Sequence, residues 1–120
     1  FGDIVSDGFA GLIGGLGFAC SANLGKEVAL FEPTHGSAPK YADYPVSIVN
    51  PVAMIESSCL MLDHLGEEQI AGRIRNSIAR VIMEGKVRTY DMMKLYGQSD
   101  VIEKGAASTR EMTNAIIQNL

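Results

Sequence analysis

Apolar residues recur at helical spacing in four segments of the chain, residues 3–16, 52–65, 67–83 and 108–120. Steps of three or four residues between apolar positions place them on one face of an α-helix. The face is clearest in residues 67–83, where four isoleucines follow one another at steps of four and the arginines lie off that row. We therefore predict four helices, with the second and third antiparallel across a very short connection.

Local signals predict where these helices begin and end. We expect the first helix to end by Gly17, the second at Gly66 and the third at Gly85, because glycine readily adopts the left-handed conformation that often follows a helix. Ser108 and Glu111 have the spacing of a capping box, so the last helix should begin there. The apolar residues expected on the buried faces are Met54, Ile55, Cys59, Leu62 and Leu65 in the second helix, and Met112, Ile116, Ile117 and Leu120 in the last.

Irregular and extended segments separate the helices. Residues 20–25 are typical of a loop, and the apolar residues 27–31 predict a short buried strand. Two prolines and a glycine make residues 32–39 a shaped loop. Residues 86–94 predict a strand or an extended loop.

Length and charge limit what the chain can be. A chain of 120 residues that is 47% apolar and 20% charged is expected to form at most one soluble globular domain. The net charge is −4 and the lysines and arginines are scattered, so we expect no nucleic-acid partner. No apolar run approaches the roughly 18–20 residues that cross a bilayer, so we expect no membrane partner. The chain begins at Phe1 without an apolar lead-in, and we expect a cut or processed end without a signal peptide.

The two cysteines, Cys20 and Cys59, lie far apart in the sequence. Neither has a second cysteine or a histidine at the spacing of metal ligands. We expect both to be buried thiols in a reducing cytosol rather than partners in a disulfide.

Asp3 and Asp7 stand four residues apart in a predicted helix, which places both carboxylates on one face about one turn from each other. Such a pair can chelate a hard divalent cation. It can equally be the acidic first turn of a helix, where carboxylates favour the helix dipole and Asp3 is a cap. The pair by itself leaves both interpretations open.

The loop around His35 has features of an anion-binding site. Residues 36–38 are all small, so their backbone N–H groups are open to a ligand. Lys40 and Tyr41 add a cation and an aromatic ring, as a phosphorylated nucleotide would require. A single loop histidine is more often structural, so this site is a hypothesis from the residues alone.

The glycine run at residues 14–17 does not match a dinucleotide fingerprint. That motif needs its third glycine three positions after the second, between a strand and a helix, whereas position 20 is cysteine and the run ends a predicted helix. We interpret the run as close helix packing, and not as a Rossmann site or a P-loop.

Three motifs, in their order along the chain, resemble the isocitrate and isopropylmalate dehydrogenase family. The first comprises residues 2–7 with the glycine run at 14–17, the second residues 31–41 with residues 50–51, and the third residues 87–91. The resemblance covers nearly the whole chain. It implies the family's own α/β fold, with a large and a small domain, rather than a Rossmann fold.

The same resemblance implies where the chain would lie in such a protein and which residues would bind a metal. Residues 1–120 would form the C-terminal portion, mostly within the large domain, with the N-terminal portion absent. Asp3 and Asp7 would be ligands of Mg²⁺ or Mn²⁺, an ion that holds a 2-hydroxy acid and stabilises the enolate left when CO₂ departs. No catalytic residue is expected in this chain, because the family's substrate-binding and catalytic side chains would lie upstream.

The resemblance also implies a cofactor site for NADP. The residues at adenosine-binding positions are His35, Gly36, Ser37, Ala38 and Asn50, and those at positions that hold the 2′-phosphate are Lys40, Tyr41, Tyr90 and Lys94. NAD-using relatives commonly place an aspartate at the Lys40 position, where its carboxylate would repel a phosphate. Lys94 stands where some members have arginine. The segment between Lys40 and Asn50 is about two residues longer than the family's pattern, carries Asp43, and is expected to bulge.

The implied function is oxidative decarboxylation of a 2-hydroxy acid with hydride transfer to NADP. Isocitrate is the expected substrate, and a homoisocitrate, isopropylmalate or tartrate-type dehydrogenase is the alternative. A non-catalytic nucleotide-binding or subunit-interaction fragment is the alternative of another class. The full-length enzyme is expected to be cytoplasmic and to form a homodimer or higher oligomer, while the 120-residue chain alone should be inactive.

Overall fold

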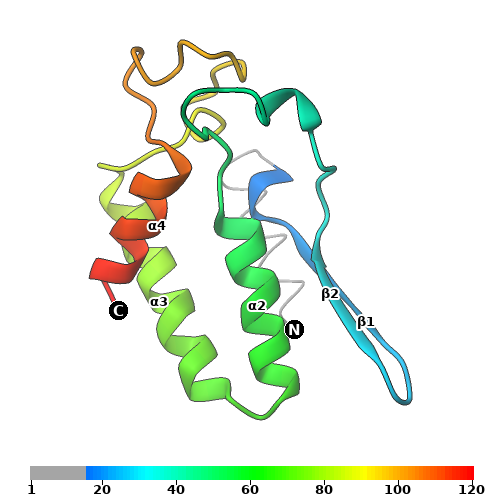
Figure 1. The fold of residues 1–120 in the computed structure, drawn as a ribbon. Coiled ribbons are helices and arrows are strands. Elements are labelled where there is room, and N and C mark those ends of the chain that lie inside the picture. Colours follow the sequence, from blue (N-terminus) through cyan, green and yellow to red (C-terminus); the bar gives the residue numbers. More distant parts are fainter. Residues whose placement is uncertain (1–15) are drawn as a thin grey trace.

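The computed structural model of the chain describes residues 16–120, so Asp3, Asp7 and nearly all of the first predicted helix lie outside the described residues. The described elements are η1 (Leu16–Phe18), β1 (Cys20–Leu24), β2 (Ala29–Pro33), η2 (Pro39–Tyr41), α2 (Val52–His64), α3 (Glu68–Glu84) and α4 (Thr109–Gln118). Figure 1 shows α2 and α3 side by side and antiparallel, with α4 against α3 and the irregular segments gathered above the helices. The described part of the chain is thus an α/β fragment whose irregular segments meet at one end of the helices.

The predicted antiparallel pair of helices is confirmed. Gly66 adopts a left-handed φ of 84° after α2, and the Glu67 N–H donates to the Leu62 carbonyl over 2.8 Å. α3 ends in the same way at Gly85, whose φ is 65°. The predicted start of α4 is also confirmed, because the Ser108 hydroxyl accepts from the Glu111 N–H and the Glu111 carboxylate accepts from the Ser108 N–H.

Apolar side chains from η1, α2, α3 and α4 form the main core of the described residues. Its buried members are Phe18, Val52, Ile78, Val81, Met112 and Ile116. The predicted buried faces were partly wrong, since four of their residues are exposed: Met54 (56%), Leu65 (66%), Ile117 (58%) and Leu120 (51%). Helical spacing identifies an apolar stripe, but the neighbouring elements decide how much of that stripe is covered.

The β-hairpin corrects two predictions. Residues 20–25 were expected to form a loop, but Cys20–Leu24 pair as a strand with Ala29–Pro33, in the register Ala22 to Phe31. The second strand begins two residues later than expected and is not buried, because its residues alternate between half-buried and exposed. Cys20–Leu24 lacks the β-branched side chains typical of strands, so its conformation depends on pairing across the turn closed by the Gly25 N–H and the Val28 carbonyl, 2.8 Å apart.

Residues 86–94 form no strand in the described structure, and from Tyr90 onward they turn. This segment satisfies its backbone groups with local bonds: the Leu95 N–H donates to the Tyr90 carbonyl over 2.9 Å and the Lys94 N–H to the Asp91 carbonyl over 3.1 Å. Lys94 takes the left-handed φ of 58° that this pattern requires. The same pair of bonds recurs at Gly105, where the left-handed residue is a glycine.

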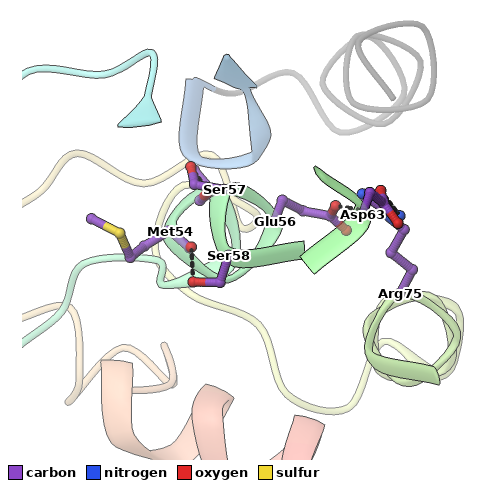
Figure 2. A network of polar contacts seen from close by, with 7 residues as sticks. Met54, Glu56, Ser57, Ser58, Asp63 and Arg75 are labelled. Carbon is purple, nitrogen blue, oxygen red and sulfur yellow. Dashed lines mark hydrogen bonds and ion pairs between the residues drawn. The ribbon is translucent and has the colours of Figure 1, made fainter. Parts of the chain in front are cut away.

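A polar network ties α2 to α3 (Figure 2). The Arg75 guanidinium on α3 lies 3.2 Å from the Glu56 carboxylate and 2.7 Å from the Asp63 carboxylate, both on α2. Met54 points away from this network on the other side of α2. Burial raises the pKa of the Glu56 carboxyl above its ordinary value, and the bond to Arg75 only partly opposes that shift.

Both cysteines are buried thiols that form no disulfide, as expected. Burial, with the Glu56 carboxylate second, raises the pKa of the Cys59 thiol to about 12. The Cys59 side chain therefore stays protonated at neutral pH and behaves as a small apolar residue.

Candidate functional site

A pocket of about 500 Å³ is lined mostly by residues of the irregular segments between the helices and strands. Its walls are residues that lie far apart in the sequence. They are Gly17, His35, Gly36, Ser37, Ala38, Lys40, Tyr41, Val49, Asn50, Tyr90 and Asp91. Four segments of the chain thus contribute to one cavity.

Asn50 connects the pocket to the first turn of α2. It is only 4% exposed, and its side chain makes two bonds. The Oδ1 atom accepts from the Val52 N–H over 3.0 Å, and the Nδ2 atom donates to the Asp91 carboxylate over 3.0 Å. Because one partner donates and the other accepts, the orientation of the Asn50 amide follows from its neighbours.

Asp91 is the carboxylate among the residues that line the pocket. It accepts hydrogen bonds from the Asn50 amide and from the hydroxyl of Thr89, a residue with no exposed surface. A methyl group on Gly17 would lie 2.6 Å from the Asp91 Oδ2 atom, so a side chain at this position would displace the Asp91 carboxylate. The pocket floor is therefore a fixed polar junction of three segments.

Two tyrosines and a lysine form another wall. The Lys40 Nζ atom lies 4.8 Å from the centroid of the Tyr41 ring, within the range of a cation–π contact. The Tyr90 hydroxyl donates to the Tyr41 hydroxyl over 3.3 Å. Burial, followed by the bond with Tyr41, raises the pKa of the Tyr90 phenol well above its ordinary value, so the ring remains neutral.

The remaining wall is the turn from His35 to Ala38. The His35 Nδ1 atom lies 2.9 Å from the Gly36 carbonyl oxygen, which identifies Nδ1 as the protonated nitrogen in the neutral ring. Ala38 takes a left-handed φ of 42° just before η2. A side chain on Gly36 would meet nothing within 4 Å, so the small residue leaves this wall open.

The structure brings together eight of the nine residues predicted to bind the cofactor: His35, Gly36, Ser37, Ala38, Lys40, Tyr41, Asn50 and Tyr90. Lys94 is exposed and does not line the pocket, so its role stays a prediction. The predicted metal ligands Asp3 and Asp7 lie outside the described residues. Within residues 16–120, no group of three or more histidine, cysteine or carboxylate side chains is arranged to hold a metal ion.

Sequence reasoning missed Gly17, Val49 and Asp91 as residues of the pocket. Asp91 carried the available signal, because it directly follows Tyr90 in the motif of residues 87–91. Gly17 was interpreted as the end of a helix and as part of a glycine run for close helix packing, and nothing local to Val49 distinguishes it from other apolar residues.

Cation, carboxylate, aromatic rings and backbone groups of small residues line one cavity, so the arrangement suits a ligand with a flat ring and an anionic group. No helix in the part of the chain that the structure describes is long and apolar enough to cross a membrane. The lining of the cavity agrees with a nucleotide site.

Comparison with known proteins decides the family. A profile of isocitrate/isopropylmalate dehydrogenases matches residues 1–116. The chain belongs to the isocitrate/isopropylmalate dehydrogenase family. Family members are enzymes that act on small molecules, and the α/β fragment described above has their fold.

The relatives that the chain resembles include isocitrate dehydrogenases and isopropylmalate dehydrogenases. The chain is 49% identical over 119 residues to the isocitrate dehydrogenase [NADP] of Thermus thermophilus, covering 99% of this chain and 22% of the relative. It is 54% identical over 87 residues to the 3-isopropylmalate dehydrogenase of Methanothermobacter thermautotrophicus, covering 72% of this chain and 26% of the relative. The chain therefore spans about a quarter of the length of these relatives.

A solved structure shows the same fold. The crystal structure of isocitrate dehydrogenase from Methylococcus capsulatus superposes with a TM-score of 0.74 at 42% identity. The match covers 98% of this chain and 31% of that chain. The described elements thus correspond to about a third of a longer family member.

Proposed function

We propose that the chain is the C-terminal portion of a metal-dependent enzyme that oxidises and decarboxylates a 2-hydroxy acid and passes the hydride to NADP. Residues 1–120 would lie mostly in its large domain and carry the adenosine end of the cofactor site. The observation that carries this proposal is Lys40 on the pocket wall, with its ammonium group over the ring of Tyr41.

The lining residues fit two parts of the adenosine end of such a cofactor. His35, the small residues 36–38 and Asn50 would face the adenosine, since they offer backbone groups and a buried amide beside an open wall. Lys40, Tyr41 and Tyr90 would hold the 2′-phosphate with one positive charge and two neutral phenols. Lys94 is proposed to add a second charge from the edge of this group. When bound, NADP supplies the hydride acceptor, and this part of the chain supplies position and charge.

The proposed metal ligands are Asp3 and Asp7. Their one-turn spacing supports chelation of Mg²⁺ or Mn²⁺, both of which prefer carboxylate oxygen. The substrate and remaining ligands would come from other parts of the enzyme, which we propose to be a cytoplasmic homodimer or higher oligomer.

Isocitrate is the proposed substrate. The relative from Thermus thermophilus that bears the name isocitrate dehydrogenase [NADP] matches 119 residues, whereas a 3-isopropylmalate/3-methylmalate dehydrogenase matches 111 and the 3-isopropylmalate dehydrogenase of Methanothermobacter thermautotrophicus matches 87. A panel of isocitrate, homoisocitrate, isopropylmalate and tartrate offered to the full-length enzyme tests the choice. Turnover of isopropylmalate above that of isocitrate would replace the proposal with the isopropylmalate alternative.

The non-catalytic alternative is tested with the 120-residue chain itself. We expect no reduction of NADP by this chain with isocitrate and Mn²⁺, and we expect turnover when the full-length enzyme is used. Absence of turnover in both, with nucleotide binding retained, would favour a nucleotide-binding or subunit-interaction role.

The cofactor is tested by Lys40→Asp in the full-length enzyme. This change replaces attraction to the 2′-phosphate with repulsion, so the Kd for NADP should rise by about 10–100-fold, while the Kd for NAD should change by less than about threefold. Lys26→Asp, in the hairpin turn and outside the pocket lining, makes the same change of charge and serves as the control. Equal weakening of NADP and NAD by Lys40→Asp would contradict the proposal.

A further inference from the structure

Tyr41 is held in place by residues that do not line the pocket. The Tyr44 ring meets the Tyr41 ring edge-on, with centroids 5.6 Å apart and planes at 69°. The Tyr44 hydroxyl donates to the Gly97 carbonyl over 3.2 Å. Neither Tyr44 nor Gly97 is among the residues that form the pocket wall.

Gly97 itself presses against Tyr41. A methyl group at Gly97 would collide with the Tyr41 hydroxyl and would lie 2.8 Å from the ring carbon that bears it. This conflict comes from packing, because Gly97 is not one of the glycines with a left-handed backbone. An alanine at position 97 can therefore keep its backbone conformation and must displace Tyr41.

The segment that contains Gly97 is held in place by apolar packing. Val101, which is fully buried, packs in a second apolar cluster with Ile48 and Ala106, and Tyr41, Tyr44 and Tyr90 pack against it. Tyr44 also lies in the stretch between Lys40 and Asn50. The hydroxyl of Tyr44 thus fastens this stretch to residues 95–106, a segment that contributes nothing to the pocket lining.

We infer that Tyr44 and Gly97 are positioning residues that set the place of Tyr41, and through Tyr41 the place of the Lys40 cation, so that residues outside the pocket control discrimination between NADP and NAD. This inference rests on the proposed cofactor site. Lys40 is exposed and has a long, flexible side chain, so its contact with the Tyr41 ring is what directs its ammonium group. A displaced Tyr41 loses both its own contact with the phosphate and its hold on Lys40.

The test uses the full-length enzyme with Gly97→Ala, Tyr44→Leu and Tyr44→Phe, and measures the Kd for NADP and for NAD together with kcat. Gly97→Ala and Tyr44→Leu should each raise the Kd for NADP by about tenfold and the Kd for NAD by less than about threefold. Tyr44→Phe keeps the ring contact and loses only the bond to Gly97, so it should raise the Kd for NADP by about threefold. The KM for NADP should rise with kcat nearly unchanged, a split that general damage to the fold would not produce.

Tyr96→Phe is the matched control, because it removes a hydroxyl beside Gly97 from a side chain that is 88% exposed. It should leave both dissociation constants unchanged.

Equal weakening of NADP and NAD binding in folded variants, or no weakening, would overturn the inference. If Gly97→Ala does not fold, Tyr44→Leu and Tyr44→Phe test the inference by the same comparison of the Kd for NADP with the Kd for NAD. If Lys40→Asp leaves the preference for NADP intact, the proposed cofactor site has failed and this inference fails with it, whereas failure of the Tyr44 and Gly97 variants alone leaves the site standing.

Discussion

In the helical region, six buried apolar side chains from η1, α2, α3 and α4 form one continuous cluster, whereas at the pocket floor the buried contacts between side chains are hydrogen bonds. Asn50 and Thr89 are both buried, and each donates to Asp91. Apolar contact has no preferred direction, but a hydrogen bond needs its atoms at a set distance and angle. Residues of suitable size can therefore maintain the helices, while the pocket depends on particular side chains.

The largest expected effect is a loss of stability caused by a substitution in the core of the helical region. Ile78 on α3 is 2% exposed in the core, so Ile78→Ala should lower the free energy of unfolding by about 2–5 kcal/mol through lost burial and a cavity. Ile117→Ala, on an exposed side chain of α4, should change it by no more than about 0.5 kcal/mol. Urea unfolding measures both. Comparable losses at the two positions would show that the core is not where the structure places it.

A smaller effect concerns the charged network between α2 and α3. The raised pKa of Glu56 means that its protonated form is favoured in the fold, so the associated stability is present below the ordinary value of 4.5 and is lost as pH rises through the raised pKa. Glu56→Gln stays neutral, so its stability relative to the parent should improve as pH increases from 4 to 7. The measurement is urea unfolding across that range.

Glu111 is the control, because its pKa is shifted in the opposite direction to that of Glu56. Hydrogen bonds from the Ser108 N–H and hydroxyl lower its pKa, so its stabilisation is present above 4.5 and is lost as pH falls through the lowered value. Glu111→Gln should therefore lose stability relative to the parent as pH rises from below the lowered pKa to above 4.5, so the urea measurements on this variant extend below pH 4. Identical pH profiles for the two variants would contradict the assigned causes.

The smallest expected change in stability is at Lys94. Here one substitution should increase the stability of the fold but decrease the affinity for NADP. Lys94 holds a left-handed φ that glycine adopts at less cost, so Lys94→Gly should raise the free energy of unfolding by under about 1 kcal/mol. If Lys94 reaches the 2′-phosphate, the same variant should bind NADP more weakly. Gly105→Ala, at the matching position of the next turn, should instead destabilise by about 1 kcal/mol. Unchanged NADP affinity in Lys94→Gly would remove Lys94 from the proposed site.

The helix ends were predictable because their signals are local. Gly66, Gly85 and the Ser108–Glu111 pair each act within one turn of the helix that they end or begin. The hairpin was not predictable in the same way, because Cys20–Leu24 becomes a strand only through its partner Ala29–Pro33. The amino-acid composition of Cys20–Leu24 by itself gives little preference for a strand.

Most of the pocket was predictable from a short run of residues, and the missing part was not. His35, residues 36–38, Lys40 and Tyr41 lie close together in the sequence and combine small residues with a cation and an aromatic ring. Asp91 acquires its place through a bond to Asn50, which lies 41 residues away, and through the close approach of Gly17. Contacts over such separations follow from the fold and are not evident from local spacing.

The Asn50 amide has a consequence for spectroscopy. Its Oδ1 atom accepts from the Val52 N–H, while the next bond of that turn runs from the Ile55 N–H to the Pro51 carbonyl over 3.0 Å and does not involve the pocket. The amide resonance of Val52 is therefore a built-in reporter for the cavity, with that of Ile55 as its neighbouring reference. A molecule that moves Asn50 or Asp91 will shift the first resonance and leave the second in place, without any label in the pocket itself.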